Sequence, residues 1–329
     1  MTGRNLVTRR DTARAAARQR EGADDERVTV GLHRLLRLRH QATGYSFLPR
    51  QPVSSLLSGR RASRLRGRGL NFEELRRYLP GDDVRTIDWR VTARTRKTHV
   101  RVFTEERDRA VLFVVDQRIH MFFGSRDRMK SVVAAEAAAL GAWRALDSGD
   151  RVGAIVFNDE RTTEVRPRRS RMTVLRILGA VARMNGELAA DSTVTPAPGR
   201  LNEVLAVVPR LAPHDALIVV VSDFQGADEE TARLATAIAA HNDLLAFHAF
   251  DPLREAPVPG PRMTVTDGRR QLELDLADGK LRERIAEDYR REIEGLRRAL
   301  RPFSAPVIPL STDGEVVDQI RRRIGTGGR

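Results

Sequence analysis

The stretch from Ala110 to Met121, AVLFVVDQRIHM, most constrains the fold because it is a short, almost wholly apolar run that stops at an acid. Six consecutive apolar residues rich in Val are typical of a strand that is buried on both faces, as in a parallel sheet covered by helices. Asp116 follows where this strand ends. The carboxyl ends of strands form the ligand crevice of open α/β sheets, so Asp116 is a candidate site residue. The alternative is that Asp116 only caps the following turn or helix.

The rest of this region alternates between strand and helix patterns. Further strands are expected over residues 152–157, 161–165, 216–221, 244–250 and 306–310. Helical spacing of apolar residues is found over residues 127–148, 172–184, 201–211, 229–240, 281–300 and 315–324. A hairpin is expected within residues 265–276. This alternation predicts an α/β fold with a doubly wound, mostly parallel sheet.

Composition excludes several classes of protein. The chain of 329 residues contains no Cys, which excludes disulfides, thiolate catalysis and cysteine metal sites. No apolar run approaches the roughly 18 residues that a transmembrane helix needs, and the charged N-terminus lacks a hydrophobic signal core. We therefore expect a cytoplasmic protein.

The basic residues cluster at two places. Five arginines fall between Arg60 and Arg68, and a second cluster extends from Arg166 to Arg171, within a chain of net charge +14. Such clusters suit phosphate binding, but a solvated basic loop is favoured over a nucleic-acid site. Residues 1–55 are expected to form a charged, partly disordered tail followed by a short amphipathic helix over residues 28–42.

An acidic triplet follows the first arginine cluster. Asp82, Asp83 and Asp88 are interleaved with several arginines, among them Arg85 and Arg94. Because these charges lie next to Trp89 and Tyr78 in the sequence, we expect an internal ion-pair cluster under an aromatic lid. The alternative, an acid and base pair of carboxylates, has no nucleophile nearby.

Together these motifs resemble the bacterial family catalogued as domain of unknown function number fifty-eight. In chain order they are Gly67-x-Gly69, Phe72-Glu73, Arg77-x-Leu79-Pro80-Gly81-Asp82-Asp83, Arg85-x-Ile87-Asp88-Trp89, Ala93-Arg94, Glu105-Glu106, Asp116, Gly124, Lys130, Gly149-Asp150-Arg151-Val152-Gly153 and Ser222-Asp223-Phe224. The likeness extends from Leu56 to Leu310. It implies a conserved family segment over residues 56–108 and a von Willebrand factor A-like domain over residues 109–329.

The resemblance also implies a function. It implies a frequent genetic association with MoxR-type AAA ATPases, whose partners act in assembly, metal insertion or stress responses, and no enzymatic activity is established for the family. We therefore expect a non-enzymatic interaction module that is an adaptor or partner of such an ATPase.

Von Willebrand factor A domains commonly bind Mg²⁺ through Asp-x-Ser-x-Ser, a distant Thr and a distant Asp, whose oxygens suit this hard ion. Here the first motif reads Asp116-Gln117-Arg118-Ile119-His120, so both serines are missing. Asp223 is the expected distant acid, and Thr193 or Thr195 is a loose candidate for the Thr. Arg118 would repel a divalent ion by about 4 kcal/mol per unit charge at 4 Å. Mg²⁺ is thus disfavoured, and no other cofactor is expected.

Our hypothesis for this site is that Arg118 takes the place of the ion. It would pair with Asp116, with Asp223 as a second candidate partner. The surface of Asp116, Arg118, His120 and Asp223 would then receive an acidic segment of a partner protein. The alternative is that Arg118 points into water and the site has decayed. Nucleic-acid binding through the arginine clusters is a second class of function, and a metal-dependent hydrolase is the third and least favoured.

Overall fold

The computed structural model describes residues 26–43, 70–79, 84–105, 109–260, 262–266, 271–300 and 306–324. The chain divides into two compact units, one over residues 54–108 and the other over residues 1–53 and 109–329. The predicted charged tail, the Arg60–Arg68 cluster, Asp82 and Asp83 lie outside the described residues.

The smaller unit contains an antiparallel strand pair and a short helix. Strand β1 (Leu70–Arg77) pairs with β2 (His99–Glu105), and η2 (Val84–Thr86) and helix α4 (Trp89–Thr95) lie between them in the chain. Asp88 caps α4, because its Oδ1 accepts hydrogen bonds from the amides of Arg90 and Val91 at 3.0 Å each.

Trp89 differs from the sequence-based expectation. Trp89 is 69% exposed, so it does not pack over the charged residues as the expected aromatic lid would. Asp88, which is only 7% exposed, takes the buried position at the start of α4, and the next residue along the helix points outward.

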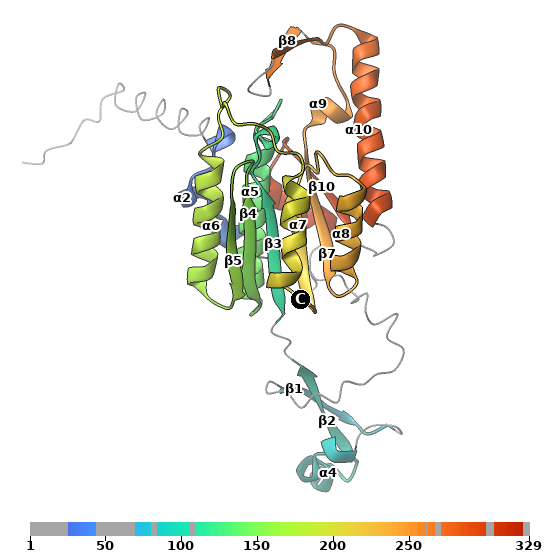
Figure 1. Cartoon of the computed structure of the whole chain (residues 1–329). Helices are drawn as coiled ribbons and strands as arrows, with labels where there is room; N and C mark the ends of the chain where they lie inside the picture. The colour runs from blue at the N-terminus through green and yellow to red at the C-terminus, as the bar shows by residue number, and fades with distance from the viewer. Residues whose placement is uncertain are drawn as a thin grey trace, which may run out of the picture. The chain divides into compact units, whose positions relative to one another are not determined.

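A six-stranded sheet forms the centre of the larger unit (Figure 1). Its strand order is β10-β7-β6-β3-β4-β5, and every neighbouring pair is parallel except β4 with β5. The strands are β3 (Ala110–Asp116), β4 (Arg151–Phe157), β5 (Thr162–Arg168), β6 (Ala216–Ser222), β7 (Asp243–Phe250) and β10 (Val307–Ser311). This arrangement confirms the predicted doubly wound, mostly parallel sheet.

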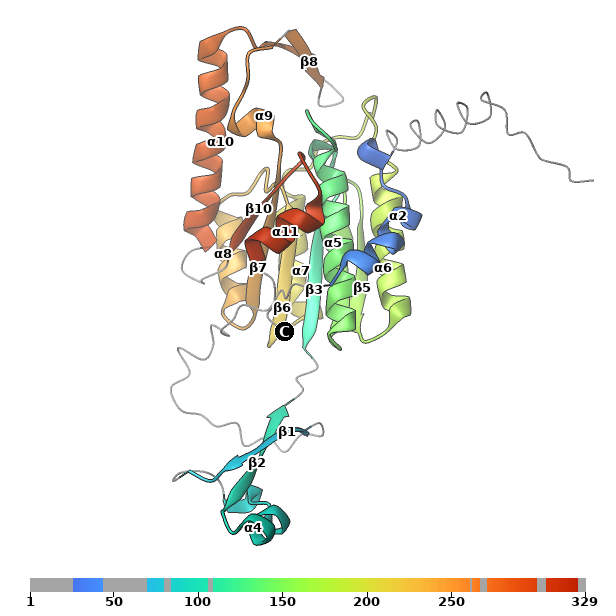
Figure 2. The ribbon, with the colours of Figure 1, turned by 180° about the vertical axis from the view of Figure 1, so that it is seen from behind.

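Helices cover both faces of the sheet (Figures 1 and 2). One face packs against α5 (Lys130–Asp147), α6 (Arg171–Asn185) and α11 (Val316–Ile324). Helices α2 (Leu32–Arg37) and η1 (Leu38–Gln41) pack on the outside of this layer, α2 against α5 and α6 and η1 against α5. The other packs against α7 (Arg200–Leu211), α8 (Glu229–Ala239) and part of α10 (Gly279–Leu300). Alternate residues of β3 enter the two cores, with Phe113 in the first and Leu112 in the second.

Three short elements lie at or beyond the carboxyl ends of the strands. Helix η3 (Ile119–Met121) follows β3, and α9 (Pro252–Glu255) follows β7. A hairpin of β8 (Arg262–Thr266) and β9 (Gln271–Asp275) then leads to α10. Among the described residues, no helix is both long and apolar enough to cross a membrane.

Candidate functional site: a buried ionic floor beneath a pocket

Parallel pairing brings the two predicted acids together. Asp116 ends β3, Asp223 directly follows β6, and these strands are neighbours in the sheet, so both acids lie at its carboxyl edge. His120, from η3, joins them. One ligand atom from each of Asp116, His120 and Asp223 lies within 4.8 Å of the others.

Arg118 pairs with Asp116 in a fork geometry. Its Nη2 donates to Asp116 Oδ2 at 2.7 Å, and its Nε lies 3.1 Å from each carboxylate oxygen. Ser222 Oγ donates to the same Oδ2 at 2.6 Å. Burial by itself lowers the pKa of Arg118, but Asp116, together with Asp223 and Asp159, more than offsets this effect, so the pKa of the guanidinium is raised and Arg118 stays charged.

The other side of the Arg118 guanidinium is also occupied by protein. Its Nη1 donates to the Pro198 carbonyl at 3.1 Å, and its Cζ lies 5.5 Å from the centre of the Phe157 ring. Arg118 is fully buried and does not point into water. A partner therefore cannot touch Arg118 directly in this conformation, which corrects the expectation that Arg118 lies on the exposed surface.

A second buried cation, Lys130, neutralises Asp223. Lys130 Nζ donates to Asp223 Oδ2 at 2.5 Å, and His120 Nδ1 lies 3.0 Å from the same oxygen. Burial raises the pKa of Asp223, but Lys130 and then His120 lower it more strongly, so the pKa lies well below its ordinary value. Asp223 is thus ionised and pairs with Lys130 and His120.

Lys130 is part of the family motif, but the sequence did not predict a role for it at this site. The signal in the sequence is a lysine at the start of a mostly apolar helix, shortly after a strand that ends in an acid. Thr193 and Thr195, the loose candidates for a metal-binding Thr, are exposed. The segment near them contributes the Pro198 carbonyl to Arg118 instead of a hydroxyl group to an ion.

The residues at this edge do not fit Mg²⁺. That ion needs several oxygen ligands in near-octahedral geometry. Both oxygens of Asp116 already accept hydrogen bonds from Arg118, and Asp223 Oδ2 accepts one from Lys130. A divalent ion would also lie beside two buried cations. We call Asp116, Arg118, Lys130 and Asp223 the ionic floor.

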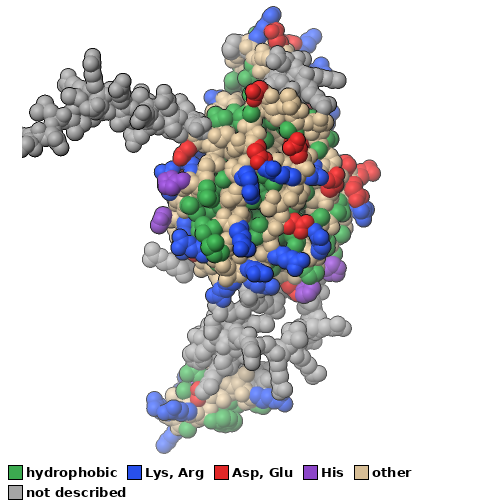
Figure 3. Space-filling view, turned by 60° about the vertical axis from the view of Figure 1, so that its left-hand side comes forward, with side chains coloured by type: hydrophobic (Ala, Val, Ile, Leu, Met, Phe, Trp, Pro, Cys, Tyr) green, Lys and Arg blue, Asp and Glu red, His purple; other side chains and the backbone are tan. Residues whose placement is uncertain are grey.

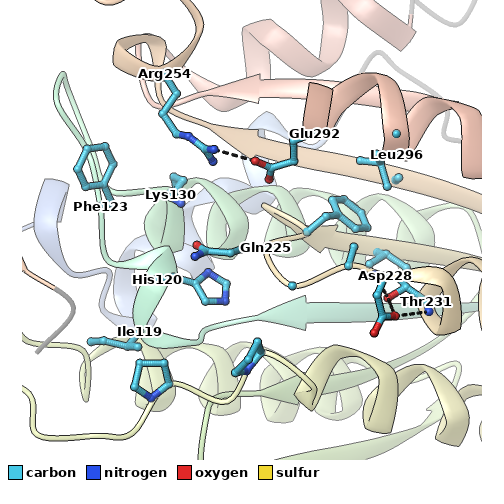
Figure 4. A pocket seen from close by; sticks show the side chains of 18 of the residues that line it. Ile119, His120, Phe123, Lys130, Gln225, Asp228, Thr231, Arg254, Glu292 and Leu296 are labelled. Atoms are coloured by element: carbon cyan, nitrogen blue, oxygen red, sulfur yellow. Dashed lines mark hydrogen bonds and ion pairs between the residues drawn. The ribbon is translucent and has the colours of Figure 1, made fainter. Parts of the chain in front are cut away.

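A pocket of about 1170 Å³ reaches from this edge of the sheet along the face beneath α8, where Val220, Leu244 and Ala246 also line it. His120 and Lys130 line it, together with residues of α8, α10 and β8. Figure 4 shows His120 from η3, Gln225 from the loop after β6, Lys130 from the start of α5, and the ion pair of Arg254 with Glu292. Of the four residues predicted to bind a partner, only His120 lines the pocket, because Asp116, Arg118 and Asp223 are buried.

The second predicted arginine cluster lies elsewhere. Arg166 and Arg168 are exposed on β5, the antiparallel edge strand, and Arg171 begins α6. Figure 3 shows that Lys and Arg side chains are frequent on the face turned forward in that view. Glu164 lies on the same strand and pairs with Arg210, so the cluster is not purely basic.

Comparison with known proteins gives both relatives and structural neighbours. Uncharacterized proteins from Mycobacterium bovis and Mycobacterium tuberculosis are each 30% identical over 292 residues, covering 85% of this chain and 86% of each relative. A solved aerotolerance-related membrane protein from Bacteroides fragilis is 12% identical with a TM-score of 0.35, covering 59% of this chain and 98% of that one. The SpRpn10 VWA domain is 12% identical with a TM-score of 0.36, covering 67% and 98%.

A family assignment follows from the length of sequence that matches. Residues 74–295 match the family described as Protein of unknown function DUF58, and this range includes β3, β6 and both acids of the ionic floor. The chain belongs to this family, and its larger unit is an α/β domain built on a mostly parallel six-stranded sheet.

Proposed function

We propose that this protein is a non-enzymatic interaction module whose pocket at the carboxyl edge of the sheet binds a partner protein. The observation that carries the proposal is the ionic floor beneath the pocket. Two buried cations pair with the two acids that would otherwise hold a metal ion, so the edge is neutralised and ordered by the chain's own side chains. Ser222 Oγ donates to Asp116, and this contact provides no activated nucleophile.

The metal part of this proposal can be tested by calorimetric titration of the full chain with Mg²⁺ and with Mn²⁺. We expect no tight binding of either ion, because Arg118 and Lys130 occupy the carboxylate oxygens. Tight binding that disappears in the Asp116→Ala variant would contradict a metal-free site.

The proposed partner is a MoxR-type AAA ATPase in an assembly or stress-response process. This part rests on the family resemblance. The test is binding of the tagged full chain to the purified ATPase of the same organism, with and without ATP and with and without nuclease. We expect capture that depends on ATP and resists nuclease.

Two histidine variants form a matched pair for this test. His120→Ala should weaken capture of the ATPase, because His120 lines the pocket. His214→Ala should leave capture unchanged, because this side chain is 71% exposed and does not line the pocket. No capture by the unmodified chain would contradict the proposed partner. Capture that is lost with nuclease would instead point to the arginine clusters and a nucleic acid.

A further inference from the structure

Strand β8 borders the pocket. Met263 and Thr264 both line it, although successive side chains of a strand point to opposite faces. Two adjacent lining residues therefore indicate that the strand presents its edge to the cavity. Strand β9 contributes no lining residue, and among the described residues β8 pairs only with β9. The outer edge of β8 thus offers backbone donors and acceptors to an additional strand.

Two acceptor atoms of pocket residues have no hydrogen-bond donor among the described residues. They are His120 Nε2 and Glu292 Oε1, and both atoms are buried. His120 Nδ1 faces the Asp223 carboxylate and so carries the ring proton, which leaves Nε2 as an acceptor when the ring is neutral. Buried polar atoms are normally satisfied, so these two acceptors call for donors from a ligand.

The charges of the lining favour a neutral or basic ligand. The three lining cations are all paired: Lys130 with Asp223, Arg254 with the other oxygen of Glu292, and Arg291 with Asp288. Asp228 and Glu229 add negative charge at the start of α8. An acidic ligand would find the cations engaged and further acids nearby, whereas a Lys or Arg side chain could donate to Glu292 Oε1.

Apolar residues form much of the wall. Ile119, Phe123, Phe224, Met263 and Leu296 line the cavity. Its volume of about 1170 Å³ exceeds the range of about 300–1,000 Å³ that is typical of small-molecule pockets. A chain segment that inserts apolar side chains suits such a space.

We propose that the pocket binds an extended peptide segment of a partner, which pairs with the outer edge of β8 and inserts apolar side chains into the cavity. A Lys or Arg side chain of the segment donates to Glu292 Oε1, and a further donor meets His120 Nε2. The inference rests on the proposed interaction function and specifies the chemistry of the partner: an apolar and basic strand, and not an acidic side chain.

The experiment is selection of a displayed random-peptide library on the purified full chain, followed by affinity measurement with the enriched peptides. We expect enrichment of alternating apolar residues with at least one Lys or Arg. Hydrogen exchange at the amides of residues 262–266 should slow when such a peptide binds. Replacing its Lys or Arg by Glu should weaken binding by about 30-fold, the change expected for loss of a central contact.

Matched variants locate the peptide. Leu296→Arg places a long charged side chain in the pocket and should weaken binding by about 30-fold or more. Glu294→Arg introduces the same residue at an exposed position of α10 that does not line the pocket, and should bind like the unmodified chain. If Leu296→Arg does not fold, Glu292→Gln serves instead, because it removes the charge without changing shape and should reduce the preference for Lys or Arg.

Several results would overturn the inference: no enriched sequence, enrichment of acidic peptides, or binding that is unchanged in the pocket variants. Its failure can be told apart from failure of the proposed partner. If the unmodified chain captures the ATPase and His120→Ala weakens this capture, but no peptide binds the pocket, only this inference fails. If basic apolar peptides bind the pocket but no ATPase is captured, only the proposed partner fails.

Discussion

At the scale of single residues, the pair of Arg118 and Asp116 shows how a buried charge becomes acceptable. Both side chains are 0% exposed, so each loses its contact with water. The fork of hydrogen bonds and the additional donor from Ser222 replace that hydration. Removing one partner leaves the other charge buried and unpaired, so it lowers the stability of the fold more than removing both partners does.

Arg118→Ala should therefore lower the free energy of unfolding by about 3 to 5 kcal/mol, because Asp116 would be left uncompensated. The double variant Asp116→Asn with Arg118→Met should lose less than the single variant, since no unpaired charge remains. Urea denaturation of the full chain measures both. A loss below about 1 kcal/mol, the value of an exposed pair, would contradict the buried arrangement.

Asp223 gives a prediction for the dependence of stability on pH. Its pKa is well below the ordinary value of 3.8, because Lys130 and His120 outweigh the effect of burial. Its stabilising contribution is therefore fully present above the ordinary pKa and is lost as the pH falls through the depressed pKa of the folded state.

In Asp223→Asn, the free energy of unfolding should fall less steeply as the pH is lowered below about 4. The reason is that the variant lacks the carboxylate that takes up a proton more readily in the unfolded chain than in the folded chain. Urea denaturation at a series of pH values measures this slope. An unchanged slope in the variant would show that Asp223 does not titrate abnormally.

At the scale of elements, helix α4 depends on its cap and not on its tryptophan. Asp88 accepts hydrogen bonds from two backbone amides at the start of the helix, whereas Trp89 is largely exposed. Hydrophobic burial therefore contributes little at Trp89, although the residue belongs to a conspicuous sequence motif.

Asp88→Ala should destabilise α4 by about 1 kcal/mol, the usual cost of losing an N-cap. Trp89→Ala should change its stability by less than about 0.5 kcal/mol, as expected for an exposed position. Hydrogen exchange at the amides of residues 90–95 in the full chain compares the two variants. Faster exchange in Trp89→Ala than in Asp88→Ala would reverse this assignment.

At the scale of the whole molecule, the N-terminal segment is part of the larger unit. Leu35 is fully buried, and its carbonyl accepts a hydrogen bond from Trp143 Nε1 at 3.2 Å. Arg34 Nε donates to the buried Glu136 at 2.7 Å, and the Val30 amide donates to Asn185 at 2.6 Å. These contacts join residues 26–43 to helices α5 and α6, which lie beyond the smaller unit in the chain.

Leu35→Ala should lower the free energy of unfolding of the larger unit by about 2 to 5 kcal/mol, because it opens a cavity in a packed core. Leu32→Ala is the matched control on the same helix and should have little effect, since Leu32 is 40% exposed. Urea denaturation followed by the fluorescence of Trp143 measures both. Equal losses would indicate that α2 does not pack as described.

Most of the sheet could be predicted because each strand carries its own signal. Buried parallel strands are continuous apolar runs, so β3 and β6 were recognisable along with the acids that follow them. Once the sheet was predicted to be parallel, Asp116 and Asp223 were expected at one edge. The exposure of Trp89 was not predictable in this way, because a short motif does not reveal which neighbours will cover it.

The ordering of strands and helices and the position of the two acids follow from local periodicity, which can be read from neighbouring residues in the chain. The pairing of Lys130 with Asp223, the complete burial of Arg118 and the pocket itself depend on long-range contacts. Segments far apart in sequence form that pocket, from η3 through α8 to β8 and α10. Burial and hydrogen bonding depend on these tertiary neighbours. Only the folded structure therefore shows that Arg118 and Lys130 are buried counterions of Asp116 and Asp223.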